Sequence, residues 1–194
     1  GNENMYSVFT AFASIAEISA LILFPIISKK MSKKNVFRMA CYLPAVGLIM
    51  LLLVGIFMPT NATLIATSGI IMKMGTGFIL GATTVMLADV IDYNEVKFGT
   101  RNESIIASFQ TLLVKGASAV SAWLIGAGLT IVGYEANIVQ SAATIFGMRV
   151  LMIGVPSVIS IIAFIIYKKG YKIEGQFQDE IISKLEEKRS AEIA

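Results

Sequence analysis

Five long apolar segments constrain this chain more than any other feature of its sequence. Each is long enough for an α-helix to cross the hydrocarbon core of a bilayer, which takes about 20 residues. The segments are 6–28, 37–58, 63–88, 104–133 and 146–167. Charged residues make up only 15% of the chain, whereas soluble domains contain about 25%. The sequence therefore predicts an all-α integral membrane protein, with a transmembrane bundle over residues 1–167 and a tail over 168–194.

Lysine and arginine predict the orientation of these spans, because positively charged loops stay on the cytoplasmic side. The segment 29–38 holds five of these residues, 88–104 holds two, and the tail holds six. The alternate connections and the N-terminal stub hold none. We therefore expect a multi-pass protein of the plasma (inner) membrane, with the N-terminus outside and the C-terminus in the cytoplasm. The opening "GNEN" directly before an apolar run suggests part of a longer chain.

Several function classes lack support in the sequence. The chain has no histidine, which is the commonest metal ligand and general base. Its single cysteine, Cys41, cannot form an internal disulfide or a CxxC metal site. It also contains no HExxH or GxSxG motif. We expect neither an enzyme nor a metal site, no resident cofactor, and no nucleic-acid partner.

Three spans carry polar side chains at helical spacing, whereas the second and fifth are nearly bare and are expected to be peripheral or lipid-facing. The stripes are Ser7, Thr10, Ser14 and Glu17; Lys73, Gly77, Leu80 and Thr84; and Ser104, Ser108, Thr111, Lys115 and Ser118. The hydroxyls alone are equally typical of hydrogen bonds between packed helices. The three charged members, however, lie about 18–24 Å along their helices from the cytoplasmic charges. A charge near mid-membrane costs roughly 2.5–3.5 kcal/mol, so these side chains should face a cavity or form a buried network.

Opposite charge and similar depth predict an ion pair between Glu17 and Lys73, joining the first and third spans. Two alternatives are that Glu17 faces Lys115, or that each charge is hydrated separately in a cavity. Small residues on the third and fourth spans predict close helix packing: Gly75, Gly77 and Gly81, then Gly116, Ala119, Ala122, Gly126 and Gly128.

The stretch 88–104, "ADVIDYNEVKFGTRNES", gathers six charges between two apolar spans. Its "TRNE" fits a capping box, with Thr100 as the N-cap of the fourth helix. Asp89, Asp92 and Arg101 cluster at the inner ends of two polar-striped helices, so we expect them to form a cytoplasmic gate that pairs when a cavity opens outward. Glu95 and Lys97 are expected to be solvated loop charges.

The sequence "LADVIDYNEVKFGTRNESIIASFQTLLVKGASA" resembles the glycoside–pentoside–hexuronide:cation symporter family, and the likeness extends through "LILFPIISKKMSKK" and "GMRVLMIGVPS" on either side. The resemblance implies the major facilitator fold, with the five spans equivalent to helices 8–12 of the C-terminal bundle. It implies alternating access around a central sugar site. It also implies that the coupling cation, Na⁺ or H⁺, binds mainly in an N-terminal bundle that this chain lacks.

The resemblance further implies roles for individual residues. Lys115 matches the family's functional lysine, Thr111 a cavity position one turn before it, and Gln110 belongs to the same motif. Leu80 stands where melibiose carriers have a tryptophan, and Glu17 and Lys73 stand where they have uncharged amides.

Two functional hypotheses follow. The first is the C-terminal part of a sugar:cation symporter for a galactoside or related glycoside, with lipid, a small sugar and the missing bundle as partners. The alternative is a non-transporting assembly or scaffold subunit, in which the charges only lock helices together. In the tail, Phe177, Ile181 and Leu185 recur at i, i+4 and i+8, which predicts a short amphipathic helix packed under the bundle.

Overall fold

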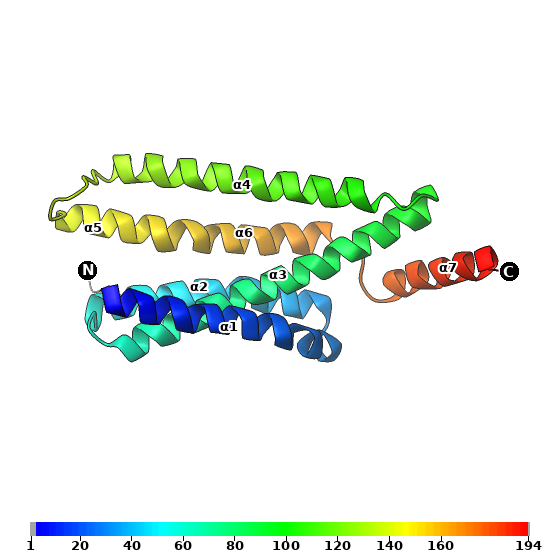
Figure 1. Ribbon diagram of the computed structural model, residues 1–194, viewed down its shortest axis with the longest axis horizontal. Helices are drawn as coiled ribbons and strands as arrows, with labels where there is room; N and C mark the ends of the chain where they lie inside the picture. Colours follow the sequence, from blue (N-terminus) through cyan, green and yellow to red (C-terminus); the bar gives the residue numbers. More distant parts are fainter. Residues whose placement is uncertain (1–2, 194) are drawn as a thin grey trace.

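The computed structural model describes residues 3–193, and helices make up most of this part of the chain (Figure 1). The helices are α1 (Glu3–Lys30), α2 (Lys33–Phe57), α3 (Ala62–Phe98), α4 (Glu103–Ile131), α5 (Ala142–Arg149), the π-helical segment η1 (Val150–Gly154), α6 (Val155–Gly170) and α7 (Gln176–Ile193). Helix α5, η1 and α6 follow one another without a break. Within the described residues, five helical stretches are long and apolar enough to cross a membrane. This result confirms the predicted number of helices that are long and apolar enough to span a membrane.

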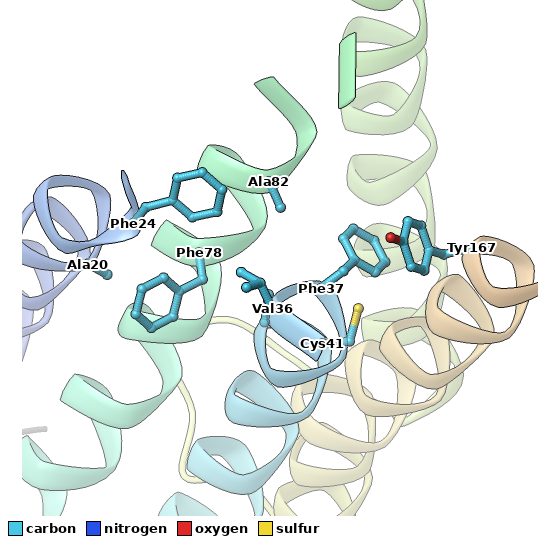
Figure 2. Packing of buried hydrophobic residues seen from close by; sticks show 9 residues of the cluster. Ala20, Phe24, Val36, Phe37, Cys41, Phe78, Ala82 and Tyr167 are labelled. Atoms are coloured by element: carbon cyan, nitrogen blue, oxygen red, sulfur yellow. The ribbon is translucent and has the colours of Figure 1, made fainter. Parts of the chain in front are cut away.

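Helix α3 is the centre of the first group of helices, because it packs against both α1 and α2. Helix α2 also packs against α6 (Figure 1). The main buried cluster lies where these four helices meet, and Figure 2 shows Phe24, Phe37, Phe78 and Tyr167 within it. Helix α4 runs alongside the α5–η1–α6 stretch (Figure 1). An apolar cavity of about 780 Å³ is lined by both of these, by Phe37 and Cys41 of α2 and by Ile79 of α3.

The expectation that the second span is peripheral or lipid-facing holds for only one face of α2. Val36, Ala40 and Cys41 are almost completely buried on its other face. Sequence polarity could not separate the two faces, because a lipid tail and an apolar helix surface are equally apolar neighbours.

Glycines of α3 allow the close packing that the sequence predicts. A β-carbon at Gly75 would lie 2.2 Å from Cδ of Pro44 in α2, and one at Gly77 would lie 2.6 Å from the backbone carbonyl oxygen of Glu17 in α1. Real side chains do not approach so closely, so only glycine fits at these crossings. In α4, an added β-carbon at Gly128 would lie 2.8 Å from the Leu151 side chain, whereas at Gly116 and Gly126 none of the described residues lies within 4 Å.

Helix α3 continues well beyond the predicted end at residue 88, so the predicted connection 88–104 is mostly helical. Its 37 residues span about 55 Å at 1.5 Å per residue, against about 30 Å for the hydrocarbon core. No glycine or proline interrupts residues 82–98. The helix ends at Gly99, which has a left-handed φ of 76°. Its N–H donates to the carbonyl oxygen of Glu95. The carboxylates of this stretch therefore stand on a rigid helix rather than a loop.

The predicted capping box at Thr100 and Glu103 is wrong. The N-cap of α4 is Asn102, and it makes no side-chain capping bond. Glu103 instead accepts a hydrogen bond from Arg101 Nε at 3.1 Å, and Thr100 Oγ1 accepts one from the Asn102 amide at 3.1 Å. The neighbouring guanidinium competes successfully for the carboxylate that the box would need.

The predicted amphipathic tail helix is confirmed as α7. Ile181 and Leu185 are each only 4% exposed, and they pack with Ile173 against Tyr93 and Val96 of α3. Phe177 is more exposed, and its ring lies 6.0 Å from that of Tyr93.

Candidate functional site

The predicted ion pair between the first and third spans is confirmed. Lys73 Nζ of α3 lies 2.9 Å from Glu17 Oε2 of α1. The other carboxylate oxygen, Glu17 Oε1, lies 3.0 Å from the Thr76 hydroxyl, which can donate either to it or to the Lys73 carbonyl oxygen at 2.9 Å. The alternative in which Glu17 faces Lys115 is not what the structure shows. About a third of each side chain is exposed, 35% for Lys73 and 30% for Glu17.

Backbone packing positions this pair. Gly77 lies one residue after Thr76 and presses against the carbonyl group of Glu17 itself. The two helix backbones therefore approach closely at the turn that carries the charges. At this separation a lysine and a glutamate reach one another directly, so each charge near mid-membrane is neutralised by its partner.

The α4 candidates lie apart from this pair. Thr111 and Lys115 are exposed and Gln110 is half-buried. The hydroxyls of Ser108, Thr111 and Ser118 donate to carbonyl groups one turn earlier in α4 itself, at 2.7–3.0 Å. Among the residues that the structure describes, Lys115 has no ion pair or hydrogen bond. Its charge is therefore not compensated within this stretch of the protein.

The C-terminal end of α3 holds a first charged cluster around Arg101. Its Nη1 lies 3.2 Å from Asp92 Oδ1 and 3.0 Å from Glu95 Oε2, and its Nε contacts Glu103. Lys188 of α7 approaches Glu95 Oε1 at 3.5 Å and donates to the carbonyl oxygen of Gly99 at 3.1 Å. The carboxylates of Glu95 and Glu103 raise the pKa of Arg101 above its ordinary value, so this guanidinium stays charged.

The expectation that Glu95 is a solvated loop charge is wrong, because Glu95 is 7% exposed and bridges Arg101 and Lys188. Lys97 does fit that expectation more closely, since in the described residues it has no ion pair and its ammonium group lies over the rings of Tyr93 and Phe98. Glu95 lies on the buried face of α3 because the helix continues to Phe98. A loop over the same residues would have left it in solvent.

Asp89 belongs to a second cluster and does not contact Arg101. Its carboxylate accepts hydrogen bonds from Lys33 at the start of α2 and from the Tyr171 hydroxyl, and it lies 3.3 Å from Gln178 Nε2 of α7. Burial, reinforced by the neighbouring carboxylate, raises the pKa of Tyr171 well above its usual value. Tyr171 therefore remains a proton donor. The structure thus brings Asp92 to Arg101, as expected, whereas Asp89 pairs with Lys33 instead.

Sequence reasoning missed Lys33, Tyr171, Gln178 and Lys188. One signal was available for the tail, because Gln178, Ile181, Leu185 and Lys188 recur at helical spacing and place polar groups at both ends of the apolar face. The contacts between α7 and α3 follow the same order along both helices. Gln178, early in α7, donates to Asp89, and Lys188, later in α7, donates to Glu95. Nothing in the sequence marked Lys33 as the partner of Asp89.

Charged side chains near mid-membrane are costly, and they commonly mark the pathway of a substrate or an ion. This fold and its charges define the class of polytopic membrane transport proteins. Residues 1–175 match the family described as MFS/sugar transport protein, and the chain belongs to that family. The match confirms the predicted major facilitator fold. Because the family is one of transport proteins, it also agrees with the expectation that the chain is not an enzyme.

The chain is also similar to three curated relatives, each of which it matches over only part of the relative's length. It is 33% identical to an isoprimeverose transporter of Lactiplantibacillus pentosus, over 93% of this chain and 37% of the relative. It is 28% identical to a putative sulfoquinovose importer of Escherichia coli, over 98% of this chain and 40% of the relative. It is 27% identical to a lactose permease of Leuconostoc lactis, over 98% of this chain and 29% of the relative. The chain therefore spans less than half the length of each.

Proposed function

We propose that this chain is the C-terminal part of a secondary active sugar:cation symporter that works by alternating access in the plasma membrane. The observation that carries this proposal is the uncovered polar face of α4. Within the described part of α4 only Gly128 is buried, and the face of Thr111 and Lys115 lies open. A membrane-spanning helix keeps such a face only where water or another polar surface covers it.

Charge balance indicates what the open face meets. Glu17 and Lys73 neutralise one another, whereas Lys115 has no acidic partner in the described residues. A cation near mid-membrane calls for a carboxylate or a water-filled cavity beside it. More than half of each reported relative lies outside the stretch matched by this chain. We infer that Lys115 faces acids of that remaining part, across a cavity that admits the sugar and the coupling cation, Na⁺ or H⁺.

The substrate proposed is a small sugar or glycoside. The relatives are named for isoprimeverose, sulfoquinovose and lactose, so the substrate class is broad. A galactoside remains the specific prediction. Thr111 lies one turn before Lys115 on the same open face, where its hydroxyl could exchange its helix bond for one to a sugar hydroxyl.

The cluster around Arg101 is proposed as part of a cytoplasmic gate, together with Asp92 and Asp89. Its support is the position of these charges at the end of α3 that extends beyond the apolar span, near the loops that the distribution of lysine and arginine assigns to the cytoplasm. Glu95 joins the proposed gate because it shares the same guanidinium. Ion pairs that form in one state and break in the other can bias alternating access by their differential energy.

Chemical modification of Lys115 in the full-length carrier tests the proposal. An amine reagent should label Lys115, and a bound substrate should slow that labelling, whereas labelling of the exposed Lys184 on α7 should be unaffected. Uptake of a panel of labelled glycosides, driven separately by a Na⁺ gradient and a pH gradient, then identifies sugar and cation. A carrier in which no glycoside protects Lys115 and neither gradient drives uptake would instead support the scaffold alternative.

A further inference from the structure

The seam between α2 and α6 has a fixed antiparallel register. The ring of Phe37 stacks on that of Tyr167 with 4.2 Å between centroids (Figure 2). Deeper in the span the rings of Tyr42 and Phe164 lie 5.7 Å apart, and Ser160 Oγ donates to the Cys41 carbonyl oxygen at 2.8 Å. Residue numbers rise along α2 as they fall along α6. The start of α2 therefore lies beside the end of α6.

This register gathers cations at one end of the seam. Arg38 lies one turn before Tyr42, and Lys168 lies one turn after Phe164, so each continues the face that makes the aromatic contact. Lys34 lies one further turn out on α2, and Lys169 follows on α6. All four are exposed, and in the described residues none forms an ion pair. The nearby carboxylate of Glu174 is engaged by the Tyr167 hydroxyl.

Like charges on adjacent helix ends repel one another, and nothing in this part of the structure offsets them. Lys33, only one residue away from Lys34, has its own carboxylate in Asp89. The seam cations differ from it in facing outward from the bundle. A bound anion lying between these cations would neutralise their positive charge.

The surface below these cations shows which kind of anion fits. Along α2, Tyr42, Val46 and Ile49 continue the face of Arg38, and along α6, Ile165 and Ile161 continue the face of Lys168. These five side chains are 44–52% exposed. A cationic end joined to an open apolar seam of membrane depth matches a phosphate group attached to acyl chains. A free phosphate would contact only the cationic end and would leave the apolar seam uncovered.

We propose that the α2–α6 seam binds an anionic phospholipid, with its headgroup phosphate between Arg38 and Lys168 and an acyl chain along Tyr42, Val46 and Ile161. Juxtamembrane clusters of lysine and arginine are attracted to anionic lipid in this way. None of these residues lies on α4, the helix that carries the face of the proposed sugar pathway.

Native mass spectrometry of the full-length carrier tests the proposal, with phosphatidylglycerol and phosphatidylcholine of identical acyl chains supplied at equal concentration. The wild-type carrier should retain phosphatidylglycerol several-fold better. The double variant Arg38→Gln/Lys168→Gln should lose this preference, whereas Arg38→Lys/Lys168→Arg should keep it. A matched control, Lys184→Gln/Arg189→Gln, removes two exposed cations of α7 and should also keep it. A preference that survives the first variant, or that the control loses equally, would overturn the proposal.

Two measurements on the wild-type carrier make the test independent of variant folding. Phosphatidylglycerol with a photoreactive acyl chain should label peptides that contain residues 42–49 or 161–165. Labelling confined to other helices would contradict the proposed position of the lipid. Inorganic phosphate should not displace the lipid at concentrations where phosphatidylglycerol does, and equal displacement would show a free-phosphate site instead.

Discussion

The backbone carbonyl of Glu17 lies so close to Gly77 that a β-carbon at residue 77 would stand 2.6 Å from its oxygen. The same turn of α1 sends the Glu17 carboxylate to Lys73 at 2.9 Å. Helix packing and charge neutralisation therefore depend on a single crossing of α1 and α3. A change that separates the backbones should also weaken the ion pair.

Gly77→Ala should destabilise the full-length carrier by about 1–3 kcal/mol, the usual cost of overpacking a tight contact. Thermal unfolding in detergent measures this effect. Gly55→Ala is the matched control, because nothing lies within 4 Å of a β-carbon there, and alanine should be neutral or stabilise the helix by up to about 1 kcal/mol. Equal melting temperatures for the two variants would show that the crossing tolerates separation.

Removing one member of the Glu17–Lys73 pair should cost more than removing both. Glu17→Gln and Lys73→Gln each leave a charge without its partner. A fully buried pair loses about 3–5 kcal/mol in this way, and the loss here should be smaller because about a third of each side chain is exposed. The double variant should recover part of the melting temperature. A double variant no more stable than the worse single one would contradict the coupling.

Lys115→Leu should lower sugar uptake by the full-length carrier about tenfold or more and alter its cation dependence. Within the described residues Lys115 has no ion pair or hydrogen bond for the substitution to break, so any loss of stability should come from the acids that Lys115 is proposed to face. Lys115→Arg keeps the charge and should retain part of the uptake. Unchanged uptake with unchanged cation dependence in the leucine variant would remove Lys115 from the proposed site.

Arg101→Ala should shift the carrier toward its inward-open state, because it releases Asp92 and Glu95 together. Accessibility of a single cysteine introduced on the polar face of α4 measures the shift, since the native Cys41 is buried. Lys97→Ala removes a nearby cation that has only ring contacts and should change accessibility little. If the two variants behave alike, Arg101 is only a loop charge.

Ile181→Ser should detach α7 from α3, because it places a hydroxyl in the buried contact with Ile173 and Leu185. Hydrogen exchange over residues 176–193 should speed up several-fold. Ile182→Ser makes the same chemical change one residue along, where the side chain is 42% exposed, and should leave exchange nearly unchanged. Equal exchange in both variants would mean that the apolar face does not hold the tail helix.

The sequence by itself determined the number of spans, the polar stripes, the Glu17–Lys73 pair and the apolar face of α7. These features follow from length and periodicity, because a bilayer fixes how long an apolar helix must be and penalises any isolated charge within it. Family resemblance added the fold, which the comparison with known proteins confirms.

Tertiary structure alone decided the basic partners of Asp89 and Glu95. Asp89 finds Lys33, 56 residues away, and Glu95 finds Lys188, 93 residues away; no local pattern encodes such pairs. It also decided which face of α2 is buried, since lipid and protein interior select the same apolar side chains. The C-terminal end of α3 shows the same division: the charges at residues 89–95 were visible in the sequence, but only the continuation of the helix to Phe98 placed them against α2, α7 and Arg101.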